Sequence, residues 1–268
     1  MAKAFSVASW NVEHFQDDPT RVERVVGFLK DQKPDVFALY EVEGKTVYNA
    51  LTSKMPNYTF HITEGPQIQE ILIGVKQGFT AFFTQKIEFK SGGSSLRPGA
   101  LLTLRRGDKD YALLFLHTKS GNDPKGMGLR DDMLVRAIKF RKVLEKALGA
   151  NQGNYLFLGD LNTMGMKYPF QKSIEATVEL QKLDQQAKKA KMRRLPKDEP
   201  ATWNNGSQST IPPSDLDHIV AADHLQFRSF GNAEVTVRGW PKEPTSSTKD
   251  QWIQKYSDHG LLYFEVQQ

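Results

Sequence analysis

The sequence predicts a fold of the α/β or α+β class, in which helices form layers around buried β-sheets. Short apolar runs alternate with helical patterns along the chain, which is typical of parallel strand–helix units. Between residues 70 and 117, four β-rich runs are separated by glycine or charged turns, which indicates consecutive hairpins. No Gly/Ser-rich linker divides the 268 residues, so we expect one domain over residues 1–268.

The first half of the chain begins with strand–helix units. Phe5–Trp10 is a predicted strand, and apolar residues from Val22 to Leu29 recur at i, i+3, i+4 and i+7, which predicts a helix. Pro34 ends that helix, and a strand at 36–40 and a short helix at 47–51 follow. The predicted hairpin strands are Glu70–Val75, Thr80–Phe89, Ala100–Arg106 and Tyr111–His117.

The second half continues the same alternation. Apolar positions from Met133 to Ala147 predict a long amphipathic helix. The apolar strand Tyr155–Leu158 follows and ends in Gly159-Asp160, and a helical pattern runs from about 169 to 190. The final predicted strands are Leu216–Val220, Phe227–Val237 and Leu261–Val266.

Composition excludes several classes of protein. The chain is 39% hydrophobic and 25% charged, which excludes disordered and fibrous proteins. The sequence contains no run of about 18 apolar residues, so no transmembrane helix is predicted. Residues 1–12 lack the apolar core of a signal peptide. The absence of cysteine excludes disulfides, cysteine-ligated zinc and cysteine nucleophiles. We therefore expect a cytoplasmic protein, and a secreted or processed form stays open.

A basic excess favours polyanionic partners. The net charge is +5 and the isoelectric point is about 9.2. Basic residues are dense between Lys182 and Lys197, where the segment is either a solvated helix face with its loop or a contact for a polyanion.

Carboxylate, amide and imidazole side chains recur where the predicted strands begin or end. A strand end fixes a side chain, and the adjoining loop leaves it accessible, so this recurrence indicates a functional site. The principal residues are Asn11, Glu41, Glu70, His117, Asp160, Asn162, Asp217, Asp258 and His259.

The motifs at these positions resemble those of the endonuclease/exonuclease/phosphatase superfamily, which has the DNase I-like fold. The segments are Ser9–Val12, Ala38–Val42, the GDxN motif Gly159–Asn162, Leu216–Ile219 and the SDH motif Ser257–His259. They occur in the family's order over nearly the whole chain. The resemblance implies a four-layer sandwich of two packed mixed β-sheets flanked by helices, with a phosphoesterase site at one end of the sheets.

The resemblance also implies roles for individual residues. Glu41, Asn11 and Asp258 would hold a metal ion, which we expect to be Mg²⁺ or Mn²⁺ because the site offers oxygen ligands. Asp160 would orient or deprotonate the attacking water. Asn162 and Asn11 would contact the phosphoryl oxygens.

Two acid–histidine pairs are expected to flank the phosphate. Asp217 would hold one ring nitrogen of His259, and Glu70 would brace His117 unless it is only an edge-strand residue. A histidine at 117 resembles the DNase I-like, sphingomyelinase-like and inositol-phosphatase-like branches, and not the abasic-site endonucleases. Arg97 resembles a phosphate-contact arginine, with a solvent-exposed turn residue as the alternative.

Two aromatic residues differ in how they fit the pattern. Tyr40 stands where the family usually has Gln before the metal-binding Glu, which alters the hydrogen bonds around that position. Trp203 resembles the family's Thr-Trp element, and it either stacks on a base or packs as part of a loop.

The sequence therefore predicts a divalent-metal-dependent phosphoesterase that hydrolyses phosphodiester bonds, with nucleic acid as the leading substrate. A phospholipid or inositol-phosphate phosphodiesterase or phosphatase is the alternative, for which Met164–Phe170 is a modest hydrophobic loop. A third alternative is an inactive polyanion-binding module. No protein partner can be inferred. The basic residues expected near the rim of the site are Lys119, Lys182, Lys188, Lys189, Arg193 and Arg194.

Overall fold

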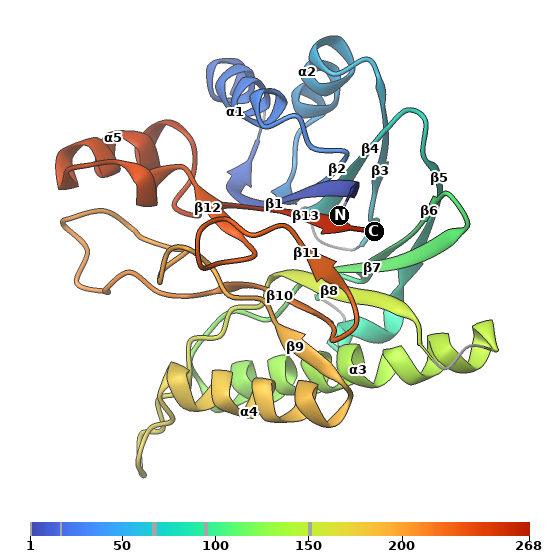
Figure 1. Cartoon of the computed structure of the whole chain (residues 1–268). Coiled ribbons are helices and arrows are strands. Elements are labelled where there is room, and N and C mark those ends of the chain that lie inside the picture. The colour runs from blue at the N-terminus through green and yellow to red at the C-terminus, as the bar shows by residue number, and fades with distance from the viewer. Residues whose placement is uncertain (1, 17, 66–68, 94–95, 150–151) are drawn as a thin grey trace.

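Two mixed β-sheets pack face to face and carry helices on their outer sides, as predicted (Figure 1). The structure is a computed structural model that describes residues 2–16, 18–65, 69–93, 96–149 and 152–268. No helix among these residues is long and apolar enough to cross a membrane.

The seven-stranded sheet contains both ends of the chain. Its order is β11-β13-β1-β2-β4-β3, and β12 also pairs with β13. β1 runs parallel to β2 and antiparallel to β13. The strands are β1 (Lys3–Phe15), β2 (Val36–Val42), β3 (Tyr58–Ile62), β4 (Glu70–Lys76), β11 (Gln226–Phe227), β12 (Thr236–Arg238) and β13 (Leu261–Gln267).

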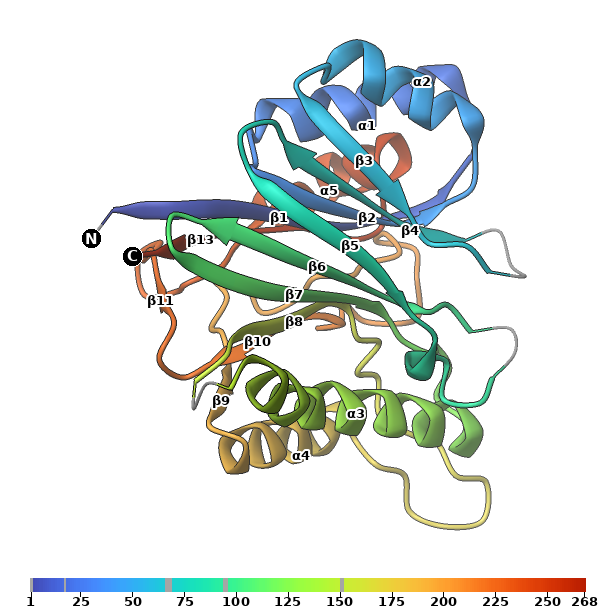
Figure 2. The ribbon, with the colours of Figure 1, turned by 90° about the vertical axis from the view of Figure 1, so that its right-hand side faces the viewer.

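The six-stranded sheet has the order β5-β6-β7-β8-β10-β9. β7 and β8 are parallel, and their neighbours in the sheet are antiparallel to them. Figure 2 shows this sheet between the other sheet and the long helix α3. The strands are β5 (Thr80–Lys86), β6 (Gly99–Arg106), β7 (Lys109–His117), β8 (Asn154–Asp160), β9 (Met192–Arg194) and β10 (Asp217–Ala222).

Helices cover the outer face of each sheet. α1 (Pro19–Asp31), α2 (Lys45–Lys54) and α5 (Ser246–Lys255) pack on the seven-stranded sheet, whereas α3 (Pro124–Leu148) and α4 (Ala176–Lys189) pack on the other. Short 3₁₀ helices occupy Ile87–Lys90 and Trp240–Lys242.

The central strands are buried on both faces, which explains their continuous apolar runs. In β1, Val7 packs between the sheets, whereas Trp10 points toward the helices and contacts Phe28 and Trp252. Leu113 and Leu158 of the other sheet join Val7 in the central core. Both sheets therefore share one core, which holds their ends at fixed positions.

The structure corrects several predicted boundaries. Helix α4 begins only at Ala176, and the strand predicted to reach Phe89 ends at Lys86. The predicted strand Phe227–Val237 is divided into β11 and β12, because the chain turns at Gly231 with a φ of 65°. The structure also contains elements that the sequence analysis did not predict, namely β3, β9, α5 and the 3₁₀ helix Trp240–Lys242.

Candidate active site

Strand pairing brings the predicted polar residues to one end of both sheets. In the six-stranded sheet, Asp160 on β8 lies in register with His117 on β7 and with Asp217 on β10. In the other sheet, Asn11 on β1 pairs with Tyr40, so that Glu41 is the next residue of β2. Both parallel pairs end here, and carboxyl ends of parallel strands are the usual place for a site.

These strand ends form one cleft of about 590 Å³. Asp217 does not line the cleft and lies buried behind His259, and Glu70 is also outside the lining. The predicted site residues that line it are Asn11, Glu41, Arg97, His117, Asp160, Asn162, Asp258 and His259.

The backbone adopts uncommon conformations around the cleft. Glu13, His14, Glu41 and Asn162 have φ values of 44°, 46°, 64° and 49°, which are unfavourable for residues with a side chain. All four line the cleft. Such conformations persist only where the surrounding structure enforces them, and they cluster at functional sites.

Asn11 connects the acidic residues of the two sheets. Its Nδ2 donates to Asp160 Oδ2 at 2.9 Å and to Glu41 Oε1 at 3.3 Å, while its Oδ1 accepts from the Glu13 N–H at 3.0 Å. The backbone contact fixes which end of the amide faces the carboxylates. The second oxygen of Asp160 accepts from the Asn162 N–H at 3.0 Å.

The predicted pair between Asp217 and His259 is present. Asp217 Oδ2 lies 2.8 Å from His259 Nδ1, and both side chains are buried. Burial opposes the charged imidazolium, but the carboxylates of Asp217 and Asp160 outweigh it and raise the pKa of His259 to about 10. One ligand atom from each of these three residues lies within 4.8 Å of the others.

Asp160 is the most central carboxylate of the cleft. Burial is the main cause that raises its pKa to about 7, and the charge of Asp217 adds to the effect. The positive charge of His259 and the hydrogen bond from Asn11 act in the opposite direction.

The predicted pair between Glu70 and His117 does not form. His117 Nε2 instead lies 3.5 Å from Asp160 Oδ2 and 3.6 Å from Glu41 Oε1, and its buried Nδ1 has no hydrogen-bond partner among the described residues. The Glu70 carboxylate accepts a hydrogen bond from Thr63 Oγ1. Burial, together with the positive charge of Arg97, lowers the pKa of His117 well below its usual value.

Arg97 lines the cleft and is held by Gln69. Its guanidinium donates to the backbone and side-chain oxygens of Gln69. Gln69 in turn approaches His14 Nδ1 at 2.6 Å and Glu41 Oε2 at 3.5 Å. Gln69 was missed by the sequence analysis, because nothing in its short surrounding motif distinguishes it from a surface glutamine.

Trp203 holds a predicted metal ligand in place. Its Nε1 donates to Asp258 Oδ2 at 2.6 Å, and its backbone pairs with Ser214 and His259. The indole also lines the cleft, so it is both a packing residue and accessible to a ligand. Tyr40 lies in the core between the sheets, where its hydroxyl is 3.0 Å from Ser9 Oγ.

A buried arginine fastens the loops that form the rim. Arg130 on α3 is completely buried and forms an ion pair with Glu179 of α4. Its guanidinium also donates to the carbonyls of Lys119, Gly121 and Gly165. These carbonyls belong to the loops that supply Ser120, Asn122, Met164 and Lys167 to the cleft.

The basic segment 182–197 is not at the rim, contrary to expectation. None of the six basic residues predicted there lines the cleft. Arg193 and Arg194 lie toward the other end of β10 from Asp217. The ion pairs of this region are Lys182–Asp131, Arg193–Glu234, Arg194–Asp184 and Lys197–Asp215.

The charges of the cleft fit a divalent metal ion. Among its described lining residues, four carry carboxylates, namely Glu13, Glu41, Asp160 and Asp258, whereas Arg97, Lys167 and the protonated His259 are the cationic ones. A phosphate ester would be repelled by this excess of carboxylates unless a cation neutralised it. Carboxylate and amide oxygens are the ligands that Mg²⁺ and Mn²⁺ prefer.

Comparisons with known proteins identify a sequence family and a shared fold. The sequence profile of the Endonuclease/Exonuclease/phosphatase family matches residues 8–259, and no curated protein sequence matches the chain significantly. Truncated TDP2 from Caenorhabditis elegans superposes with a TM-score of 0.68 and 17% identity, covering 98% of this chain and 97% of that chain.

Two further structures broaden the comparison. TDP2 from D. rerio, solved in complex with a single-strand DNA product, has a TM-score of 0.60 and 15% identity, with 98% and 99% of the two chains covered. A mannosyl-6-phosphatase from Bacteroides thetaiotaomicron has a TM-score of 0.61 and 13% identity, with 98% and 100% covered. At these identities the likeness shows a common fold.

Proposed function

The chain belongs to the endonuclease/exonuclease/phosphatase family, and we propose that it is a divalent-metal-dependent phosphodiesterase that cleaves nucleic acid. One observation carries the proposal. Residues from four distant parts of the sequence, Asn11, Glu41, Asp160 and His259, meet in a single cleft at the ends of both sheets. Their side chains are the carboxylate, amide and imidazole groups that hydrolysis of a phosphate ester requires.

Glu41, Asn11 and Asp258 would hold the metal ion, which we propose to be Mg²⁺ or Mn²⁺. The bound ion would supply positive charge to the phosphoryl oxygens. Asn11 Oδ1 accepts from the Glu13 N–H and Nδ2 donates to Asp160, so Asn11 would reach the ion through a bound water. Asp258 would be positioned by its hydrogen bond from Trp203.

Asp160 would orient the attacking water and accept its proton. Its Oδ1 accepts from the Asn162 N–H and its Oδ2 from Asn11 Nδ2, and each carboxylate oxygen keeps a second lone pair for the water. Asn162 donates one amide hydrogen to the carbonyl of Thr118, which leaves the other for a phosphoryl oxygen.

His259 would contact the phosphate through Nε2, because Nδ1 is bound to Asp217. A charged imidazolium at this point would stabilise negative charge on the phosphate or give a proton to the leaving oxygen. Arg97, which also lines the cleft, would add a guanidinium to the phosphate contacts.

Nucleic acid is the substrate class that we favour. The chain is basic overall, and Lys167 and Asn122 both line the cleft. A structurally similar protein, the D. rerio TDP2, was solved with a single-strand DNA product.

A lipid or inositol phosphate is the second candidate. The loop that supplies Met164 and Lys167 to the cleft carries Phe170, whose side chain is 86% exposed. An exposed aromatic at a loop tip is typical of a residue that enters a lipid surface.

A substrate panel tests both candidates. Plasmid DNA, single-stranded DNA and RNA, sphingomyelin, phosphoinositides and a phosphotyrosyl-DNA ester would each be incubated with Mg²⁺, Mn²⁺ or EDTA. We expect metal-dependent cleavage of a nucleic acid. Phosphate release from a lipid or inositol phosphate with intact nucleic acid would replace the favoured substrate with the second candidate.

A variant distinguishes an enzyme from a binding module. Asp160→Ala should lower kcat/KM by about a hundredfold or more while polyanion affinity persists, because a positioned proton acceptor contributes this much. The matched control is Asp131→Ala, which removes a surface carboxylate paired with Lys182 on the helical layer. Equal activity of Asp160→Ala and the wild type would exclude the assigned role.

A further inference from the structure

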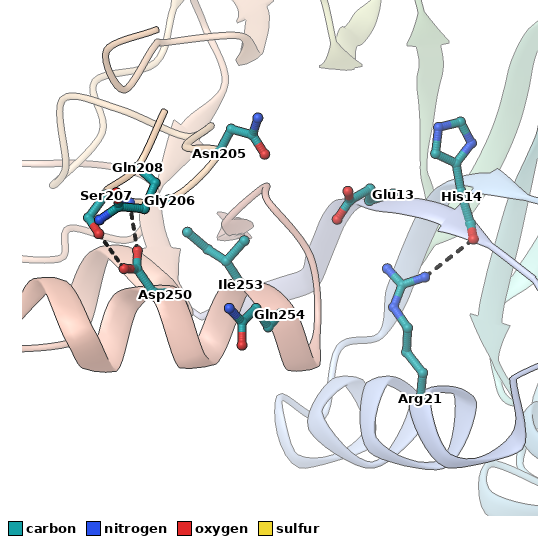
Figure 3. A pocket seen from close by; sticks show the side chains of 10 residues that line it. All are labelled: Glu13, His14, Arg21, Asn205, Gly206, Ser207, Gln208, Asp250, Ile253 and Gln254. Carbon is teal, nitrogen blue, oxygen red and sulfur yellow. Dashed lines mark hydrogen bonds between the residues drawn. The ribbon is translucent and has the colours of Figure 1, made fainter. Parts of the chain in front are cut away.

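A second hollow adjoins the catalytic cleft. It has a volume of about 500 Å³ and shares Glu13 and His14 with the cleft, so a bound substrate could extend from one into the other. Figure 3 shows it between the end of β1 with α1 on one side and α5 with the 205–208 segment on the other. We call this hollow the side trough. Its volume is within the range of about 300–1,000 Å³ that small-molecule sites occupy.

The charged groups of the side trough are committed to the protein itself. The Arg21 guanidinium donates to the carbonyls of Val12, His14 and Tyr256. Both oxygens of Asp250 accept from Ser207, one from its N–H at 2.8 Å and one from its hydroxyl at 2.5 Å. Neither charge is therefore free to bind a charged ligand.

The uncommitted groups of the side trough are neutral amides. Among the described residues, the side chains of Asn205, Gln208 and Gln254 line the side trough without an intramolecular hydrogen bond. Ile253 adds an apolar surface between them, as Figure 3 shows. The carboxylate of Glu13 stands at the boundary with the cleft and would repel a second phosphate.

This chemistry fits a nucleobase. An amide side chain offers a donor and an acceptor side by side, which matches the edge of a base, and an apolar side chain packs on its flat face. We propose that the side trough binds one unpaired base of the substrate next to the scissile phosphate. The inference rests on the proposed function and specifies single-stranded nucleic acid, because a base in a duplex is stacked and paired.

The test compares a substrate that has a base with one that has none. Cleavage of a short single-stranded oligonucleotide and of bis(p-nitrophenyl) phosphate would be measured with Mg²⁺ for the wild type and for Gln208→Ala combined with Gln254→Ala. We expect the ratio of kcat/KM for the oligonucleotide to kcat/KM for bis(p-nitrophenyl) phosphate to be on the order of tenfold lower in the double variant than in the wild type. The reason is that two hydrogen bonds to the base are lost. Gln181→Ala, an exposed glutamine on α4, is the matched control and should leave the ratio unchanged.

Oligonucleotides with one abasic nucleotide at successive positions sharpen the test. In the wild type, one position should reproduce the loss caused by the double variant. Combining that abasic substrate with the double variant should add no further loss, because both changes remove the same contact.

The outcomes separate this inference from the proposed function. An unchanged ratio in the double variant, or losses that add at every abasic position, would overturn the subsite while leaving the phosphodiesterase intact. Cleavage of a sugar phosphate that depends on Gln208 and Gln254, without an effect on oligonucleotides, would make the side trough a carbohydrate site. If the wild type hydrolysed neither substrate, the proposed function itself would fail and the subsite with it.

Discussion

Two of the histidines that line the cleft are buried, one beside each sheet, and the surroundings of their two rings differ. His259, before β13, has Asp217 at 2.8 Å from Nδ1 and a pKa raised to about 10. His117, at the end of β7, has an Nδ1 without a partner among the described residues and a pKa well below its usual value. Both rings are buried, so burial alone does not explain the difference.

Neighbouring charges account for the difference between the two imidazoles. Burial disfavours the charged form of both rings; the carboxylates of Asp217 and Asp160 reverse that effect at His259, whereas the positive charge of Arg97 adds to it at His117. We therefore expect the charged His259 and the neutral His117 to have different roles. His117 would orient Asp160 and Glu41 through Nε2, whereas His259 would act on the phosphate.

The largest effect is expected when the carboxylate of the Asp217–His259 pair is replaced. Asp217→Asn should lower kcat/KM by about a hundredfold or more, because His259 would lose the charge that keeps it protonated. Steady-state kinetics on the preferred substrate, beside thermal unfolding, would measure the effect. An active Asp217→Asn variant of normal stability would show that the pair does not serve the reaction.

An intermediate effect is expected at the unpaired histidine. Glutamine places an amide N–H near the position of Nε2, so His117→Gln should keep more activity than His117→Asn, which should lose about tenfold. The same two substitutions at His259 should be equally inactive, because neither restores a positive charge. Similar rescue patterns at the two positions would contradict the comparison.

The smallest effect is expected at Glu70, whose carboxylate does not contact His117. Glu70→Gln should change kcat/KM by less than about threefold, since the amide oxygen can still accept from Thr63. Kinetics of Glu70→Gln and Asp217→Asn under the same conditions would measure the contrast. A loss as large as that of Asp217→Asn would support the pair with His117 that the sequence suggested.

The presence of the Asp217–His259 pair and the absence of the Glu70–His117 pair also show what could be predicted from the sequence. Both predicted pairs lie between the two sheets, because Asp217 is on β10 of the six-stranded sheet and the SDH motif precedes β13 of the other. The segment of Thr202 and Trp203 joins Asp217 to the SDH motif, since Thr202 accepts from the Asp217 N–H and Trp203 bridges to His259. The proposed contact of Glu70 depended on a short match and on the separation between the same two sheets. The interval between sheets is set by packing, for example by Tyr40 in the central core, and the chain order does not encode it.

The missed elements have a similar cause. α5 buries Trp252 but has no continuous apolar stripe, so periodicity gave no helical pattern. Its visible signal was the cap at Thr245, whose side chain and that of Thr248 bond each other's backbone. The side trough depends on this helix, which is why the sequence analysis could not anticipate it.

The buried position of Arg130 was likewise not predictable from the sequence pattern, and it has a consequence for the loops around the cleft. An arginine on a helix is ordinarily assigned to the surface. Arg130 is instead buried and donates hydrogen bonds to the carbonyls of Lys119, Gly121 and Gly165. Those contacts involve backbone oxygens alone, so the outward-facing side chains of the same loops can change without disturbing the anchor. Substrate preference in this protein can therefore diversify by point substitution, while the frame that presents those side chains stays constant.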